Sequence, residues 1–102
     1  MQEFILAKRE QIAELCRKHH VRRLSVFGSA ARDDFDPERS DVDLRVEFVP
    51  LEPREYAQNY YALQEALVQL FGRSVDLLSI PVIRNRFLRK EIEETQELLY
   101  AA

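Results

Sequence analysis

Three aspartates and one Gly-Ser pair have the residue types and spacing that phosphate and metal chemistry requires. Gly28-Ser29 follows an apolar run, Asp41 and Asp43 are separated by one residue, and Asp76 lies in a later apolar run. Alternate residues of a strand point to the same face, so Asp41 and Asp43 are expected side by side, about 6–7 Å apart along the strand. Together these residues predict a place for phosphates and a place for the cations that accompany them.

The Gly-Ser pair has the features of a phosphate-binding turn. Gly28 has no side chain, so phosphate oxygens can approach its backbone closely, and Ser29 adds a hydroxyl donor. We expect a helix to begin near Ser29, whose free N–H groups and positive dipole end would face the same phosphates. Arg32, one turn later, either neutralises a phosphate or braces the loop.

The three aspartates predict a metal site. Carboxylate oxygens without histidine or thiolate favour Mg²⁺ or Mn²⁺ over Zn²⁺. Asp76 completes the group if its strand pairs beside the strand that carries Asp41 and Asp43. Carboxylates that share one face repel each other without a cation. We therefore expect metal binding, and a loss of stability when the metal is removed.

Hydrophobic spacing and turn residues predict an α/β protein with the order α-β-α-β-α-β-α and a small three-stranded mixed sheet covered by helices. No repeat or linker divides it, so residues 1–102 are expected to form one domain. Strict alternation of polar and apolar residues over 41–48 suggests that one sheet face is open and carries the aspartates. The expected elements are helices at 3–19, from Ser29, at 53–71 and at 82–100, and strands at 24–27, 41–48 and 75–80.

Composition excludes several classes of protein. The 102 residues carry a formal net charge of -3, which argues against bulk binding of nucleic acid. No apolar run approaches the length of a membrane span, and the single cysteine fits a reducing compartment, so we expect a cytoplasmic protein. A core this small also favours a homo- or hetero-oligomer.

Other conspicuous residues have simpler interpretations. Cys16 lies on an apolar helical stripe and is expected to be a buried thiol. The tyrosines at 56, 60 and 61 are expected to be core and edge aromatics, although they could also line a partner surface or stack on a base. The cations of the last helix form either a solvated face or a contact with an acidic partner or with phosphates; they are Arg84, Arg86, Arg89 and Lys90.

The motif GSAAR followed by SDVDLRVEF resembles the nucleotidyltransferases of the DNA polymerase beta superfamily. More narrowly, it resembles the minimal nucleotidyltransferases that act as antitoxins beside all-helical HEPN toxins. This resemblance implies the nucleotidyltransferase fold and the transfer of AMP from ATP to a hydroxyl, a tyrosine of the toxin, with two Mg²⁺ ions (or Mn²⁺) and release of pyrophosphate. It implies that Gly28 and Ser29 bind the triphosphate, that Asp41 and Asp43 hold the metals, and that Asp76 binds the metal that activates the acceptor.

Two residues depart from the family pattern. Asp33 stands where the family often has glycine, and Arg45 stands on the polar strand face where the family has an apolar residue. Arg45 either contacts nucleotide or acceptor, or pairs with Glu47 or another carboxylate. Two other functions remain open: a non-catalytic antitoxin that acts by occlusion, and a transferase for small molecules.

Overall fold

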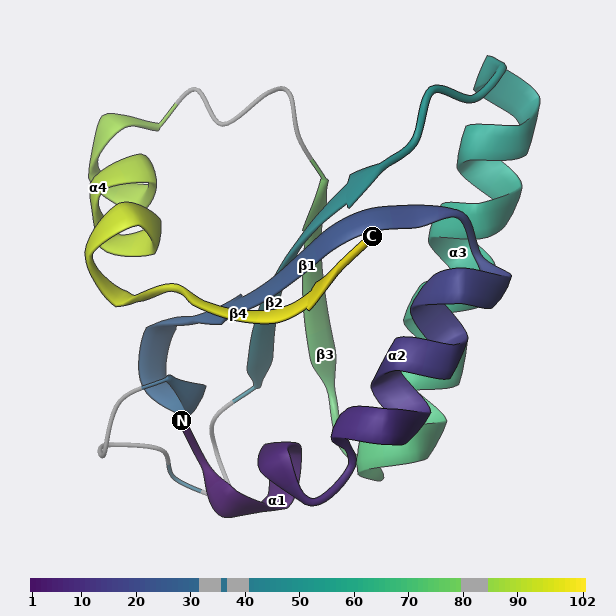
Figure 1. The fold of residues 1–102 in the computed structure, drawn as a ribbon. Coiled ribbons are helices and arrows are strands. Elements are labelled where there is room, and N and C mark those ends of the chain that lie inside the picture. The colour runs from purple at the N-terminus through teal and green to yellow at the C-terminus, as the bar shows by residue number, and fades with distance from the viewer. Residues whose placement is uncertain (32–35, 37–40, 80–84) are drawn as a thin grey trace.

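The computed structural model describes residues 1–31, 36, 41–79 and 85–102, and it has three layers (Figure 1). Within these residues four strands form one mixed sheet in the order β3-β2-β1-β4. Helices α2 and α3 cover one face, and α4 lies on the other (Figure 1). The elements are α1 Glu3–Leu6, α2 Arg9–Lys18, β1 Val21–Phe27, the 3₁₀ turn η1 Gly28–Ala30, β2 Val42–Phe48, α3 Pro53–Phe71, β3 Val75–Ser79, α4 Arg86–Thr95 and β4 Glu97–Ala101.

The α/β class is confirmed, but the prediction of three strands is wrong. The end of the expected last helix leaves helical geometry at Gln96 (φ -61°, ψ 140°), and β4 pairs antiparallel with β1. Without β4, strand β1 would expose an edge of unpaired N–H and C=O groups. Pairing that edge outweighs the helical preference of glutamate and leucine in this segment. None of the described helices is long and apolar enough to cross a bilayer.

The predicted alternation of β2 is confirmed, and it separates the core from the site. Val42, Leu44 and Val46 are fully buried beneath α2 and α3, whereas the polar residues between them are only half-buried. Burying a leucine or valine side chain contributes about 1.5–3 kcal/mol relative to leaving it exposed. The main core therefore lies on one side of the sheet, and the side that faces α4 remains polar along β2.

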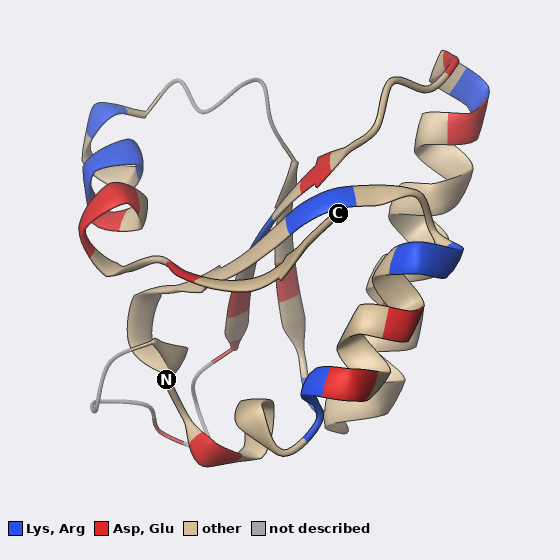
Figure 2. Cartoon of the chain, in the orientation of Figure 1, with Lys and Arg blue, Asp and Glu red and all other residues tan. Residues whose placement is uncertain are grey.

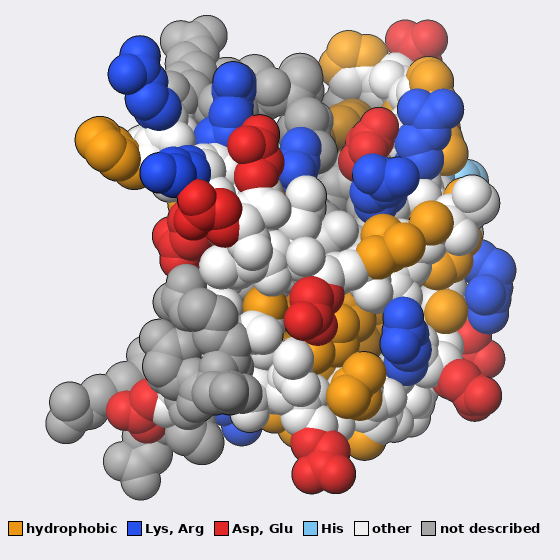
Figure 3. Space-filling view, turned by 60° about the vertical axis from the view of Figure 1, so that its left-hand side comes forward, with side chains coloured by type: hydrophobic (Ala, Val, Ile, Leu, Met, Phe, Trp, Pro, Cys, Tyr) orange, Lys and Arg blue, Asp and Glu red, His pale blue; other side chains and the backbone are white. Residues whose placement is uncertain are grey.

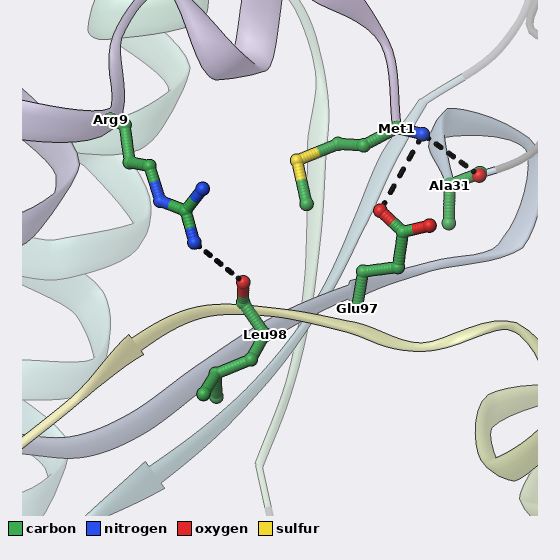
Figure 4. A network of polar contacts seen from close by, with 5 residues as sticks. All are labelled: Met1, Arg9, Ala31, Glu97 and Leu98. Atoms are coloured by element: carbon green, nitrogen blue, oxygen red, sulfur yellow. Dashed lines mark hydrogen bonds and ion pairs between the residues drawn. The ribbon is translucent and has the colours of Figure 1, made fainter.

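The helix expected at 3–19 is broken into α1 and α2. The backbone leaves helical geometry at Lys8 (φ -109°, ψ 16°). The N-terminal residues are instead held toward the Gly-Ser turn, because the Gln2 N–H donates to the Ala30 carbonyl and the Met1 amino group to the Ala31 carbonyl. The same amino group lies 3.5 Å from a carboxylate oxygen of Glu97 on β4, and Figure 4 shows this ion pair. Arg9 of α2 also donates to the carbonyl of the next β4 residue, Leu98 (Figure 4).

Helix α3 begins and ends as its sequence predicts, and it covers the outer edge of the sheet. Pro53 occupies its first turn, and Gly72 ends it in the left-handed conformation (φ 65°, ψ 30°). The Tyr60 hydroxyl and the Gln64 amide donate to the carbonyls of Leu77 and Val75 on β3. These bonds satisfy outward-facing carbonyls of an edge strand, which would otherwise be available for pairing with another chain.

Candidate active site

The sheet places two of the three predicted aspartates beside each other. Strands β2 and β3 run parallel, and their register pairs Asp43 directly with Asp76. Neighbouring strands lie about 4.8 Å apart, so carboxylates from these two positions can reach one cation. Figure 2 shows acidic positions on the adjacent strands of the sheet. The condition under which Asp76 can complete the group, pairing of its strand beside β2, is therefore met.

Asp41 lies just outside the strand that was expected to hold it. It is exposed and precedes β2, which begins at Val42. Among the described residues, no group of three or more His, Cys, Asp or Glu side chains could hold a metal ion. The Asp43–Asp76 pair offers hard oxygen ligands that suit Mg²⁺ or Mn²⁺. The three-carboxylate group itself stays a prediction.

Gly28 lies so close to Asp43 that a side chain at this position would require the carboxylate to shift. Gly28 has φ +69°, and a Cβ atom built on it would lie 2.7 Å from Oδ2 of Asp43. The contact follows from the sheet, because the residue before Gly28, Phe27, pairs with Asp43 across β1 and β2. The glycine expected for phosphate approach therefore also allows close approach to a carboxylate of the site.

The turn after β1 is a short 3₁₀ element rather than the start of a described helix. Its N-cap position is Phe27, so Ser29 lies inside the turn and does not cap it with its side chain. The Ala31 N–H donates to the Gly28 carbonyl and closes the turn. Arg32 and Asp33 lie outside the described residues, so both interpretations of Arg32 stay predictions.

Thr95 was not predicted from the sequence, yet it holds the Gly-Ser turn. The Gly28 N–H donates to Oγ1 of Thr95 at 3.1 Å, and the Thr95 hydroxyl donates to the Glu91 carbonyl at 2.7 Å. This hydroxyl connects the last turn of α4 with the end of β1. No spacing rule could find a contact between residues this far apart in sequence.

Tyr60 is a second neighbour that sequence analysis did not place at the site. Burial raises the pKa of Tyr60, and the nearby Asp76 carboxylate raises it further because it opposes a second negative charge. The phenol therefore stays protonated at neutral pH and donates to the Leu77 carbonyl. Its hydrogen bond fixes β3 next to the position of Asp76.

The buried thiol expected at Cys16 is confirmed. Cys16 is fully buried in the core beneath the sheet. Burial raises the pKa of its thiol to about 12, so it has no tendency to act as a nucleophile at neutral pH.

Comparison with known proteins connects this site to nucleotidyltransferases. A family model described as a nucleotidyltransferase domain matches residues 8–99. A chain of Methanocaldococcus jannaschii named "Putative protein adenylyltransferase MJ0128" is 38% identical over 96 residues, which span 94% of this chain and 90% of that relative.

Solved structures share the fold. One described as a "putative minimal nucleotidyltransferase" has a TM-score of 0.70 at 32% identity, and the match covers 93% of this chain and 92% of that one. A crystal structure of a toxin-antitoxin with AMP-PNP has a TM-score of 0.69 at 18% identity, and the match covers 92% of this chain and 73% of that one. With its Gly-Ser turn, its paired aspartates and a family model that spans most of its length, the chain belongs to the nucleotidyltransferase domain family.

Proposed function

We propose that this protein is a metal-dependent adenylyltransferase that moves AMP from ATP to a tyrosine hydroxyl of an all-helical HEPN toxin, and so acts as the antitoxin in the cytoplasm. The pairing of Asp43 with Asp76, in contact with the Gly-Ser turn through Gly28, is the observation that carries the proposal. Relatives named as protein adenylyltransferases and a toxin–antitoxin neighbour that contains AMP-PNP support the donor and the partner.

In this proposal each part of the site has one role. Gly28 and Ser29 would receive the triphosphate, and Asp41, Asp43 and Asp76 would hold two Mg²⁺ ions, which Mn²⁺ could replace. The ions would neutralise phosphate charge and favour the ionised acceptor hydroxyl. The acceptor oxygen forms a bond with the α-phosphorus, the bond from the α-phosphorus to the β-bridging oxygen breaks, and pyrophosphate leaves. Asp76 accepts the proton of the hydroxyl.

In this proposal, contacts within the protein hold the Gly-Ser turn in position before the nucleotide binds. Thr95 uses the Gly28 N–H, and Asp43 fills the space that a side chain at Gly28 would need. The Thr95 hydrogen bond ties the turn to α4, and a turn that is already fixed costs less to order on binding.

Labelled transfer tests the proposal. The protein, α-³²P-ATP and Mg²⁺ are incubated with an all-helical HEPN protein, for which the neighbouring genes are the first place to search, and label on that protein is located by mass spectrometry. Asp43→Asn and Asp76→Asn should each reduce transfer by about 100-fold or more, because metal electrostatics contribute several kcal/mol. Glu65→Gln, an exposed change on α3, is the matched control. Equal transfer by the Asp43→Asn, Asp76→Asn double variant would refute the proposal.

A non-catalytic antitoxin is the second candidate. It is favoured by one observation, that the described residues do not gather three metal ligands. The same double variant decides between the two functions. If it transfers no AMP but still protects cells from the toxin, the protein acts by occlusion.

A further inference from the structure

A small polar cavity opens on the sheet face that carries Asp43. Its volume is about 40 Å³, and its lining residues are Arg23, Ser25, Arg45, Glu47 and Gln96, called here the arginine pocket. The register pairs Ser25 with Arg45 and Phe27 with Asp43, so the pocket lies two residues further along β2 than Asp43. That step is about 6–7 Å along one strand face. The pocket is therefore a neighbour of the proposed transfer site and not part of its carboxylate row.

Arg45 contributes a buried donor that lacks an acceptor. Its Nη1 atom donates to Oε1 of Gln96 at 3.3 Å, whereas its Nε atom is buried without a hydrogen-bond partner in the part of the chain that the structure describes. Buried donors of a charged group are costly to leave unpaired. A ligand oxygen in the pocket would satisfy this N–H.

The charge balance of the pocket favours an anion. Arg23 and Arg45 contribute two guanidinium groups, and Glu47 contributes one carboxylate. An oxygen of the Glu47 carboxylate also lies 3.6 Å from Nη1 of Arg22, and this ion pair neutralises part of the negative charge of Glu47. The pocket keeps an excess of positive charge, and the planar fork of arginine matches carboxylate geometry.

The volume of the pocket selects the size of the ligand group. One water-sized probe needs about 10–15 Å³, so about 40 Å³ accommodates a group of two or three heavy atoms and not a purine ring. The triphosphate already has a place in the proposal, at the Gly28-Ser29 turn beyond the end of β1. On these grounds, and resting on the proposed function, we propose that the arginine pocket binds a carboxylate side chain of the acceptor protein close to the modified hydroxyl.

The surface beside the pocket also fits an acidic protein. The first half of α4 carries exposed Arg86, Arg89 and Lys90, and its first turn has no acidic residue. Arg86 and Arg89 oppose the helix dipole at this end of α4. Lys90 lies 3.8 Å from Glu94 in an i,i+4 ion pair that supports the helix. Figure 3 shows Lys and Arg side chains gathered in the upper part of this face. Phe87, in the first turn of α4, is 83% exposed and offers an apolar contact next to these cations.

Peptide binding tests the proposal without requiring catalysis. The probe is a fluorescein-labelled peptide with one tyrosine flanked by two aspartates, and its partner peptide has asparagines in their place. We expect the aspartate peptide to bind at least about tenfold more tightly, and Arg45→Gln or Arg23→Gln to abolish that difference. Arg23 is exposed, so its replacement does not threaten folding. Arg54 is exposed on α3, which covers the opposite face of the sheet, so Arg54→Gln should leave peptide binding unchanged.

Three results would overturn the proposal: equal binding of the two peptides, an equal loss with Arg54→Gln, or weaker binding of AMP-PNP with unchanged peptide binding in Arg45→Gln. The last result would assign the pocket to a phosphate of the nucleotide. If the peptides are discriminated as expected but no AMP is transferred to any acceptor, the pocket stands and the proposed transfer reaction fails.

Discussion

Replacing Gly28 with alanine should destabilise the protein more than the same replacement at Gly72. Both glycines are left-handed, with φ +69° and φ +65°. A Cβ atom at Gly72 would meet nothing within 4 Å, whereas one at Gly28 would lie 2.7 Å from Oδ2 of Asp43. The pair of variants therefore separates the cost of the backbone conformation from the cost of contact with the carboxylate.

The expected magnitudes follow from these two differences. A left-handed conformation costs an alanine about 1–2 kcal/mol, and this is the expected loss at Gly72. Overpacking against Asp43 adds about 1–3 kcal/mol at Gly28. The gain from a less flexible unfolded chain is the same for both variants and cancels in their difference. Gly28→Ala should thus lose about 1–3 kcal/mol more free energy of unfolding than Gly72→Ala.

Urea unfolding followed by circular dichroism measures both losses, since the chain has no tryptophan to report by fluorescence. Asp43→Ala removes Oδ2 and Cγ, the atoms at 2.7 Å and 3.5 Å, and leaves only Cβ at 3.6 Å. In that background, Gly28→Ala should cost about as much as Gly72→Ala, within about 0.5 kcal/mol.

The reasoning would be refuted if Gly28→Ala cost no more than Gly72→Ala. It would also be refuted if the excess cost persisted after Asp43 was removed, because the contact would then not be its origin. A lower affinity for AMP-PNP in Gly28→Ala but not in Gly72→Ala would further tie the contact to the nucleotide turn.

Two further predictions concern groups outside the aspartate row. Thr95→Val leaves the Gly28 N–H unpaired, so it should lower the free energy of unfolding by about 1–3 kcal/mol and weaken AMP-PNP binding. Thr95→Ser keeps the hydroxyl and should retain both the stability and the binding. Equal behaviour of the two variants would contradict a role for the hydroxyl. Burial raises the pKa of the Cys16 thiol from 9.0 to about 12, so the folded state favours the neutral thiol. The resulting contribution to the free energy of unfolding is complete below pH 9 and is lost as the pH rises toward 12. The stability advantage over Cys16→Ala should fall by up to about 4 kcal/mol across that range in urea titrations at stepped pH, and parallel pH profiles would contradict the assignment.

Local patterns predicted the parts of the fold that local forces control. Strand β2 follows from its alternation, since each apolar side chain must leave water on one face. Helix α3 follows from Pro53 and Gly72, which suit its first turn and its left-handed end. These signals need no knowledge of distant residues.

The errors occur where distant segments compete with local preference. Residues 97–101 have a helical composition but pair with β1, because an unpaired strand edge costs more than the lost helical propensity. The helix expected at 3–19 is divided at Lys8, and residues 1 and 2 are bonded to the carbonyls of Ala31 and Ala30 at the end of η1. Neither partner is visible in the spacing of the segment itself.

The candidate site shows the same division. The residue types, the Gly28-Ser29 dipeptide and the strand face of Asp43 are predictable from the chain, because they depend on side-chain chemistry and on a period of two. The position of Asp76 beside Asp43, the hydrogen bond from the Gly28 N–H to Thr95 and the pocket that Arg45 lines come from the folded arrangement of distant segments. Strand register and helix docking depend on packing of the whole core, and no short stretch of sequence contains that information.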